Sequence, residues 1–384
     1  MPRRKIESPA HPPEERRNDI RTVAARAGVS IASVSRTING LPTVDPKIAK
    51  KVWAAAKELG YQPNTQARAL GSGRSRLFGL IISDIMNPFF PELIQNFEDT
   101  AVKFGYEILI GSTAHDPKLM ERVIDRMLQR NVEGAAVMTF GVEETVIDRL
   151  AGRRLPLVFI DMAPNAEGMS SLTVDYAKGI GQAVQHLVVL GHSRIGFIAG
   201  PAGLHSAILR EQAFRSAMID IGLSPPARHI VRGDHTLEGG TEAMAALLRL
   251  EVPPTAVMCS NDMTAIGVLH AAVDAGFKVP EQMSVIGFDD IHIARYMIPP
   301  LTTIQLSCRD LAQTALEALR ACVEHDRENR FRNYQISTQL IVRRSTGIPY
   351  EGLSVPAFRA ELGEPVEARQ FVRTPERMKT DGIP

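Results

Sequence analysis

The sequence predicts an N-terminal all-α helix-turn-helix head followed by an α/β body of two doubly wound parallel-sheet lobes. Residues 20–40 hold two short helical patterns joined by a glycine turn. From residue 77 onward, continuous apolar strands alternate with amphipathic helices, a pattern typical of parallel sheets covered on both faces. Charge divides at the same place: residues 1–76 carry fifteen Lys and Arg against six Asp and Glu, although the 384-residue chain has a net charge of only +1.

The first two helices are predicted because suitable capping residues stand at their ends. Asp19 can cap the first helix, Gly28 can adopt the left-handed conformation of the turn, and Ser30 can cap the second helix. An ordinary helix hairpin with a glycine turn is the alternative interpretation. The apolar faces consist of Val23, Ala24 and Ala27 in the first helix and of Ile31, Val34, Ser35 and Ile38 in the second.

A third helix is predicted from Pro46 to about Leu59. The segment 43–46 supplies an N-cap and a proline at the first helical position, and Gly60 ends the helix. Trp53 is expected to pack against the other helices, although a lone tryptophan is also compatible with a phosphate contact. The inner face of this helix consists of Val52, Ala55, Ala56 and Leu59.

A head of this kind offers the N-terminal end of its second helix to a DNA major groove, and its positive charge attracts phosphates. Arg36 is expected to bind the edge of a guanine, with a phosphate contact as the alternative. Ile31 and Ala32 can make only apolar contacts, so part of the specificity must come from DNA shape. The head residues expected at the DNA are Ser30, Ile31, Ala32, Ser33, Ser35, Arg36 and Asn39.

The body contains two series of alternating elements, which predict two similar lobes. Strands are predicted at 77–82, 106–110, 134–138, 156–160, 194–198, 256–259 and 284–287. Helices are predicted at about 91–104, 117–130, 177–190, 206–221, 236–249 and 262–275.

Polar residues follow several of these strands. Because ligands of open α/β sheets bind beyond the carboxyl ends of the strands, such residues from both lobes predict one ligand site. Carboxylates, an amide and a guanidinium beside phenylalanine rings suit a polyhydroxylated ligand, since they bind hydroxyls while a ring stacks on the apolar face of a sugar. Asn261 or Asp262 could instead cap a helix, and Asp290 could be solvated. The expected ligand-binding residues are Ser83, Asn87, Phe89, Phe90, Asp161, Arg210, Asn261 and Asp289.

Three segments in order, VAARAGVSIASVSRTING, ELGYQPNTQARAL and FGLIISDIMNPFF, resemble the lactose-repressor (LacI/GalR) family of bacterial transcription regulators. The resemblance runs from about residue 19 to residue 347. It implies a periplasmic-binding-protein-like body in which the chain returns to the first lobe near residues 302–322 and crosses again near 336–342. It also implies the same ligand-binding assignment for Phe89, Asp161, Arg210, Asn261 and Asp289.

Residues 64–70 correspond in this family to a hinge helix that folds when two subunits lie side by side on an operator. The resemblance implies that Leu70 enters the minor groove at the centre of the operator, where apolar side chains kink DNA. Simple dimer packing is the alternative for Leu70. Asn64 and Arg68 join Leu70 as expected DNA contacts in this segment.

Two departures from the family pattern bear on the ligand. Met162 follows Asp161 where relatives that bind simple pentoses often have arginine, and Leu306 stands where they often have glutamine, so Gln305 is displaced from that register. The loss of two polar groups favours a ligand less hydroxylated than ribose, or differently shaped. Cys308 either faces the ligand site or is a buried structural cysteine.

Other classes of function lack support. Gly179 and Gly181 form half of a dinucleotide-binding pattern, but they lie in a predicted helix, where close packing explains them better. His186 and His192 have no third ligand at metal spacing, and no motif of a phosphate-binding loop, zinc protease or serine hydrolase occurs. We therefore expect no catalytic residue, no metal and no cofactor other than a small-molecule effector.

Location is expected to be the bacterial cytoplasm, in association with the nucleoid. The three cysteines form no paired motif, which fits a reducing compartment. No run of eighteen apolar residues occurs, and residues 1–18 lack an apolar signal core. The expected domains are a basic extension (1–18), the helix-turn-helix domain (19–62), a hinge helix and linker (63–76), a two-lobed ligand-binding and dimerisation domain (77–346), and a disordered tail (347–384).

The predicted function is a ligand-responsive, DNA-binding repressor of sugar or carbohydrate genes that binds a palindromic operator as a homodimer. One alternative is the same architecture sensing a non-sugar metabolite. Another is an enzyme or a sugar-binding module fused to a DNA-binding head. The tail holds no leucine heptad, so tetramerisation through a C-terminal coiled coil is not expected.

Overall fold

The computed structural model describes residues 19–40, 43–62, 74–139, 155–161, 169–224, 226–324 and 332–350. The expected N-terminal extension, Asn64, Arg68, Leu70 and residues 351–384 lie outside this described part. The chain divides into two compact units. The first unit holds Met1–Met86, Leu93–Leu172 and Leu311–Tyr334, and the second holds Asn87–Glu92, Thr173–Asp310 and Gln335–Pro384.

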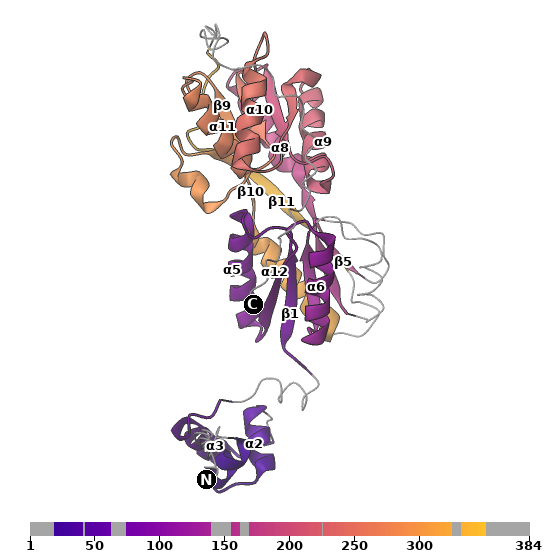
Figure 1. The fold of residues 1–384 in the computed structure, drawn as a ribbon, viewed down its shortest axis with the longest axis vertical. Helices are drawn as coiled ribbons and strands as arrows, with labels where there is room; N and C mark the ends of the chain where they lie inside the picture. The colour runs from indigo at the N-terminus through magenta and orange to yellow at the C-terminus, as the bar shows by residue number, and fades with distance from the viewer. Residues whose placement is uncertain are drawn as a thin grey trace, which may run out of the picture. The chain divides into compact units, whose positions relative to one another are not determined.

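Residues 19–62 form the head, with helices α1 (Ile20–Ala27), α2 (Ile31–Ile38) and α3 (Pro46–Glu58) (Figure 1). The predicted caps are confirmed: Asp19 accepts a hydrogen bond from the first turn of α1, and Ser30 does the same for α2. Gly28 has the left-handed φ of 65° that the turn requires. The small core consists of Val23, Ala24, Val34, Val52, Ala55 and Ala56.

Two head residues lie differently from their predicted packing. The prediction that Trp53 packs against the other helices is wrong, because its side chain is 49% exposed. Val52 is fully buried, and the next residue of a helix points about 100° away from it. Ile31 fits the apolar stripe of α2 by spacing but is 48% exposed, so the buried face of this helix is centred on Val34.

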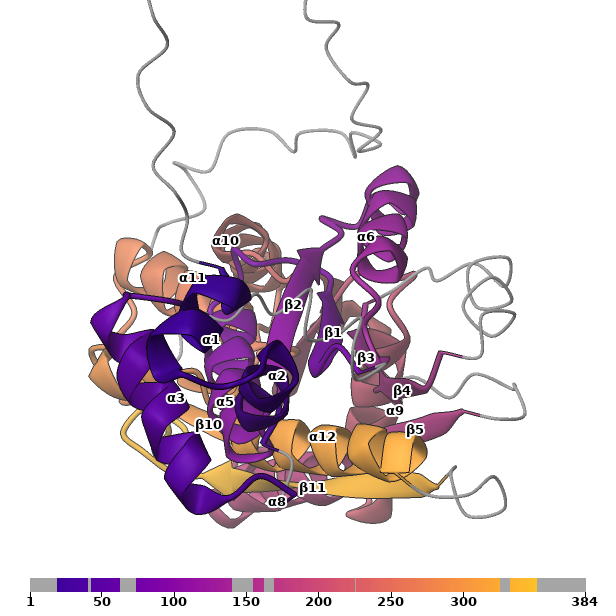
Figure 2. The same cartoon turned by 90° about the horizontal axis from the view of Figure 1, so that it is seen from below.

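The sheet of the first unit has the strand order β2-β1-β3-β4-β5, with parallel pairing throughout. Helices α5 and α12 cover one face of this sheet, and α6 covers the other (Figure 2). Ile124 and Met127 of α6 pack with Ile81, Val137 and Phe159 of the strands. The elements are β1 (Leu77–Ile82), α5 (Phe89–Lys103), β2 (Glu107–Ser112), α6 (Pro117–Gln129), β3 (Gly134–Met138), β4 (Leu157–Ile160), β5 (Ser170–Asp175) and α12 (Cys308–Glu324).

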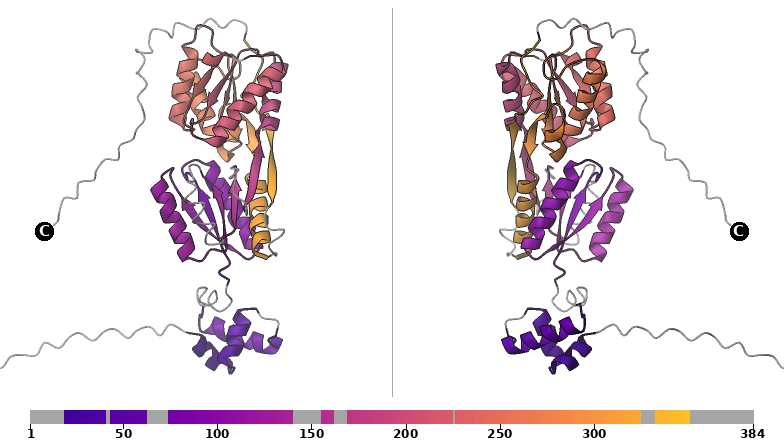
Figure 3. Two further views of the ribbon diagram at one scale, coloured as in Figure 1. Left: turned by 90° about the vertical axis from the view of Figure 1, so that its right-hand side faces the viewer. Right: turned by 90° about the vertical axis from the view of Figure 1, so that its left-hand side faces the viewer.

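The second unit has the strand order β11-β10-β9-β8-β6-β7. Its pairs are parallel except for β10 and β11, which are antiparallel. Helices α8 and α9 pack on one face of the sheet, and α10 and α11 pack on the other (Figure 3). The elements are α8 (Tyr176–Val189), β6 (Ile195–Ala199), α9 (His205–Asp220), β7 (Ile230–Arg232), α10 (Leu237–Leu248), β8 (Ala256–Cys259), α11 (Asp262–Asp274), β9 (Ser284–Asp289), β10 (Thr302–Leu306) and β11 (Asn333–Ile341), with short 3₁₀ helices at Ala227–His229 and His292–Tyr296.

The predicted strands and helices of the body are confirmed, and their ends differ by no more than two residues. The chain re-enters the first unit at Leu311 and leaves it after Tyr334, as the family resemblance implies. Strands β5 and β7 were not predicted. Strand β7 has only three residues, too few for a periodic pattern, and β5 alternates between buried and half-buried residues instead of forming a continuous apolar run.

Close helix packing is confirmed as the explanation for Gly179. A Cβ atom at this position would lie 2.5 Å from Cγ2 of Ile304 and 2.5 Å from Oγ1 of Thr338, so α8 can approach β10 and β11 only with glycine here. A Cβ atom at Gly181 would meet nothing within 4 Å, so that position carries no such constraint. Within the described part of the chain, no helix is both long and apolar enough to cross a membrane.

Candidate functional site

Helix α2 exposes the surface expected to face DNA. The Ser30 hydroxyl accepts a 3.1 Å hydrogen bond from the Ser33 backbone N–H, and this bond fixes the start of the helix. Ser33 and Ser35 are half-buried, and the Ser35 hydroxyl accepts a long hydrogen bond of 3.5 Å from the Asn39 amide. The side chains exposed on and beside this helix are Ser30, Ile31, Ala32, Arg36 and Asn39.

The positive charge of the head is largely free to meet phosphates. Arg26 is engaged by Glu58 at 2.6 Å, but both side chains are more than half exposed, so the pair adds little stability. The other Lys and Arg residues described in the head are exposed: Arg21, Arg36, Lys47, Lys50, Lys51 and Lys57. Exposed cations around a capped, solvent-facing helix are the arrangement that a salt-dependent DNA interface requires.

In the second unit, Arg210 and Asp289 come together although 79 positions separate them. Arg210 lies on α9 and Asp289 ends β9, and Nη2 of Arg210 is 3.5 Å from Oδ1 of Asp289. Both side chains are only 7% exposed. The guanidinium lies 3.9 Å from the centre of the Phe288 ring and also donates to the Ser260 carbonyl. A buried cation is thus held by a carboxylate, a carbonyl and an aromatic face, as burial of charge demands.

Asn261 stands beside this pair, and its side chain caps α11. Its Oδ1 accepts from the Thr264 N–H at 2.9 Å, and its Nδ2 donates to the His235 carbonyl at 3.1 Å. Asn261 is therefore the N-cap of α11, and these two bonds use one acceptor lone pair and one donor hydrogen of its amide. His235 is a neighbour that sequence reasoning missed: its Nε2 lies 2.8 Å from the Ser260 hydroxyl. It was missed because it follows β7, the three-residue strand that carries no periodic signal.

Two further carboxyls lie close to Asp289. Asp262 is fully buried, and it accepts hydrogen bonds from the Thr303 hydroxyl and from the Ile291 N–H. Burial raises the pKa of Asp262 well above its ordinary value, and the charges of Asp289 and Asp290 act in the same direction. The solvated alternative for Asp290 is wrong, because its side chain is 4% exposed and pairs with Arg343.

The first unit places its own polar residues at the carboxyl ends of its strands. Ser83 follows β1, and its buried hydroxyl has no hydrogen-bond partner among the described residues. Asp161 follows β4, is 7% exposed and has a left-handed φ of 60°. Thr113 and Thr139 follow β2 and β3, and their hydroxyls lie 3.0 Å apart. Sequence reasoning missed these two threonines, although the same rule of position after a strand would have found them.

The start of α5 holds three expected ligand residues. Asn87 lies two residues before α5, and its Oδ1 accepts a 3.1 Å hydrogen bond from the N–H of Phe89, the first residue of the helix. The rings of Phe89 and Phe90 are buried and meet edge to face, with centres 5.5 Å apart. Cys308 approaches the Phe89 carbonyl at 3.9 Å, and burial raises the pKa of its thiol. These contacts fit the structural alternative for Cys308.

Metal binding finds no support in the described residues, which contain no group of three or more His, Cys, Asp or Glu side chains placed to hold an ion. His186 hydrogen-bonds to the Thr346 hydroxyl. His192 is buried, and its ring nitrogens approach Thr255 and Ser284 at 2.8 and 3.0 Å. Both histidines therefore have structural partners.

Comparison with known proteins divides the chain in the same way. Residues 19–64 match the model of the bacterial regulatory proteins of the lacI family, and residues 184–346 match the model of a periplasmic binding protein-like domain. The ribose operon repressor of Escherichia coli (strain K12) is 36% identical over 304 residues, which are 78% of this chain and 91% of that protein.

Two solved structures extend the likeness to the whole architecture. The lac repressor dimer bound to operator and the anti-inducer ONPF matches with a TM-score of 0.75 and 28% identity, over 85% of this chain and 98% of that chain. The complex of the transcriptional regulator CelR with cellobiose matches with a TM-score of 0.64 and 26% identity, over 86% of this chain and 100% of that chain. Each likeness covers both the helical head and the α/β body.

Proposed function

Because this chain belongs to the lacI family of bacterial regulatory proteins, we propose that it is a repressor that binds a palindromic operator as a homodimer and responds to a sugar or sugar derivative. The observation that carries this proposal is the exposed, Ser30-capped helix α2 on a basic head, in one chain with a periplasmic binding protein-like body. As a family member, the chain is a DNA-binding transcriptional regulator.

At the operator, α2 of each subunit enters a major groove, and the two heads bind two half-sites. The lac repressor structure, a dimer on its operator, supports this arrangement. Arg36 binds a guanine edge, and the exposed lysines of α3 contribute phosphate attraction. The proposed DNA contacts are Ser30, Ile31, Ala32, Ser33, Ser35, Arg36 and Asn39, together with Asn64, Arg68 and Leu70 of the hinge segment.

The effector is bound by the polar residues at the strand ends. Arg210 supplies fixed donors and Asp289 supplies acceptors, a combination that suits a hydroxylated ligand. The ribose operon repressor and the CelR–cellobiose complex support a sugar, and a non-sugar metabolite is the second candidate. The proposed effector contacts are Ser83, Asn87, Phe89, Phe90, Asp161, Arg210, Asn261 and Asp289.

Effector and operator are coupled reciprocally, typically by about 1–3 kcal/mol, or roughly 5–150-fold in affinity. The protein acts in the cytoplasm, at the nucleoid, and has no enzymatic activity. Its domains are the extension 1–18, the helix-turn-helix domain 19–62, the hinge and linker 63–76, the ligand-binding and dimerisation domain 77–346, and the tail 347–384.

The test uses the full chain and begins with its DNA target. Genomic fragments that the protein retains at low ionic strength are sequenced, and the enriched palindrome is titrated at fixed salt. A panel of sugars and sugar phosphates is then screened for a thermal shift, and each compound that shifts the protein is added to the operator titration. We expect one compound to change operator affinity by roughly 5–150-fold. Indifference to duplex DNA, or an affinity for DNA that no compound alters, overturns the proposal.

A further inference from the structure

The chain turns sharply at the end of β9, and we call Asp289, Asp290 and Ile291 the β9 corner. Asp289 has a φ of 115° and Asp290 a φ of 59°, two consecutive values that favour glycine. Residues other than glycine persist in such conformations only where the surroundings hold them. The contacts of the corner therefore decide where the Asp289 carboxylate lies.

One side of the β9 corner is held by Asp262. One oxygen of its buried carboxyl accepts the Ile291 N–H at 2.9 Å, and the other accepts the hydroxyl of Thr303 on β10. Gly287 makes room for this carboxyl, because a Cβ atom there would lie 2.0 Å from the Asp262 oxygen. Asp262 thus connects the start of α11, the corner and β10.

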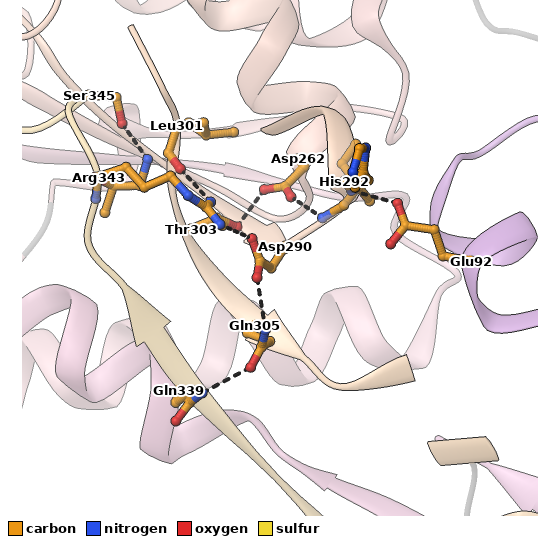
Figure 4. Close-up of polar contacts among 12 residues, drawn as sticks. Glu92, Asp262, Asp290, His292, Leu301, Thr303, Gln305, Gln339, Arg343 and Ser345 are labelled. Atoms are coloured by element: carbon orange, nitrogen blue, oxygen red, sulfur yellow. Dashed lines mark hydrogen bonds and ion pairs between the residues drawn. The ribbon is translucent and has the colours of Figure 1, made fainter. Parts of the chain in front are cut away.

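The other side is held through the Asp290 carboxylate. Arg343 donates to Oδ1, and the Gln305 amide donates to Oδ2 at 2.8 Å (Figure 4). Arg343 is itself fixed, because its Nη1 donates to the Leu301 carbonyl at 2.8 Å. Gln339 of β11 donates to Oε1 of Gln305 at 2.9 Å and so sets the orientation of the Gln305 amide.

Strand register explains why a glutamine stands at position 305. Gln305 of β10 lies opposite Asp289 of β9 on one side and Gln339 of β11 on the other. Thr303 lies on the same face of β10, two residues earlier, whereas Leu306 on the opposite face is buried. The displaced Gln305 is therefore placed beside the corner, where it binds Asp290.

We propose that Gln305 and Arg343 are positioning residues for effector recognition: they hold Asp290 and thereby fix Asp289 beside Arg210. This inference rests on the proposed function, because it takes Asp289 and Arg210 as effector contacts. A buried carboxylate that loses one of its hydrogen-bond donors raises the free energy of the folded state. The β9 corner therefore shifts to a position in which Asp290 can bind water or another donor. Asp289 then moves with its neighbour.

The experiment compares full-length proteins in which a glutamine that donates to a carboxylate is replaced by glutamate. In Gln305→Glu, a carboxylate opposes Asp290. In the control Gln313→Glu, the same change is made on the exposed face of α12, where Gln313 donates to Glu317. The double variant Gln305→Glu/Asp290→Asn restores an amide–carboxylate pair in reverse. Gln305→Leu, which adds no charge, is the second test variant if Gln305→Glu fails to fold.

The readout is the side-chain NMR signal of Arg210 in protein labelled with ¹⁵N-arginine, recorded without DNA or sugar. This signal is identified by its absence in Arg210→Lys, and it is sensitive because the guanidinium lies over the Phe288 ring. We expect Gln305→Glu to shift the Arg210 signal by more than its line width. The double variant should restore the chemical shift of the unmodified protein, and Gln313→Glu should leave it unchanged. An unmoved signal in a folded Gln305→Glu or Gln305→Leu protein overturns the inference.

A second measurement separates this inference from the proposed function. D-ribose and cellobiose are titrated into the same proteins by calorimetry. If either sugar binds the unmodified chain, we expect Gln305→Glu to weaken it at least tenfold and Gln313→Glu less than twofold; equal affinities overturn the positioning role. If neither sugar binds, D-ribose and cellobiose are excluded as effectors, and the NMR signal of Arg210 remains the test of the positioning role.

Discussion

The guanidinium of Arg210 lies 3.9 Å from the centre of the Phe288 ring and forms an ion pair with Asp289. Two consecutive residues, Phe288 and Asp289, therefore contact the same guanidinium. One face of the planar group is therefore taken by the ring, and its edge is left for hydrogen bonds. Nη1 reaches the Ser260 carbonyl while Nη2 faces Asp289. This arrangement uses the two-pronged shape of arginine and not only its charge.

We therefore expect Arg210→Lys to abolish effector binding while operator binding without effector is kept. A lysine ammonium is a point charge that cannot reach both partners in the same plane. The measurement is the thermal shift given by an active compound from the sugar screen. Arg215→Lys is the matched control, because Arg215 lies on the same helix, is 43% exposed and pairs with Glu211 at 2.8 Å. Comparable shifts in both variants would remove Arg210 from the effector site.

Arg36→Ala is expected to relax base preference at one position in each half-site. The side chain is exposed on α2, and a bidentate contact with guanine contributes about 1–3 kcal/mol of discrimination. Binding is measured at fixed salt on operators that carry each base at each position. Lys57→Ala, an exposed cation of α3, serves as control and should weaken all sequences about equally. A uniform loss for Arg36→Ala would instead assign it to a phosphate.

The local features of the head were predictable because each depends on residues only a few positions apart. Asp19, Gly28 and Ser30 act on the backbone within three or four residues, and all three behave as their residue types require. The packing of Trp53 was not predictable in this way. It depends on which face of α3 meets the other two helices, and Val52 takes that place.

The positions of the residues proposed to bind the effector were predictable only as far as the ends of the strands were. The rule that ligands bind beyond the carboxyl ends of strands brought Arg210 and Asp289 into one group, and the structure brings them together. The burial of Asp290 depends on Arg343, which lies 53 positions later, and no local pattern reports such a contact. His235 was not predicted for a different reason: the strand that it follows, β7, has only three residues and carries no periodic pattern.

Two glycines of α8 form a matched pair for a test of packing. Gly179→Ala should destabilise the protein by about 1–3 kcal/mol, because the added methyl meets Ile304 and Thr338 at 2.5 Å. Gly181→Ala should be neutral or stabilise by up to about 1 kcal/mol, since helical alanine is favoured and the space is open. Urea unfolding of the full chain, followed by circular dichroism, gives both free energies. Equal effects at the two positions would contradict the packing role of Gly179.

Ser30→Ala is expected to destabilise the head by about 1 kcal/mol through loss of the α2 cap. Trp53 is the single tryptophan of the chain and lies in α3, so its fluorescence in a urea titration reports the unfolding of the head within the full-length protein. Thr22→Ala is the control, because α1 keeps the backbone hydrogen bond from Thr22 to Asp19. A midpoint for Ser30→Ala that equals that of Thr22→Ala would argue against the cap.

Stability should also respond to pH through His192. Burial lowers the pKa of His192, so the ring stays neutral to a lower pH in the folded protein than in the unfolded chain, which binds a proton below about pH 6.5. The unfolded state then holds more protons, and the free energy of unfolding contributed by this residue falls as the pH drops from about 7.5 to 5.5, by at most about 1.4 kcal/mol. Burial shifts the pKa of His186 and His229 in the same direction.

Asp262 acts in the opposite direction to His192. Folding raises the pKa of this carboxyl, so its contribution to the free energy of unfolding decreases as the pH rises. The informative quantity is therefore the difference between variants. Urea unfolding at pH 5.5, 6.5 and 7.5 should show that His192→Gln reduces the acid-induced loss of the free energy of unfolding relative to the unmodified chain. If His192→Gln and the unmodified chain lose the same free energy between pH 7.5 and 5.5, folding does not lower the pKa of His192, and the ring is protonated at pH 5.5 in the folded protein; its contacts with Thr255 and Ser284 would then need both ring nitrogens as donors.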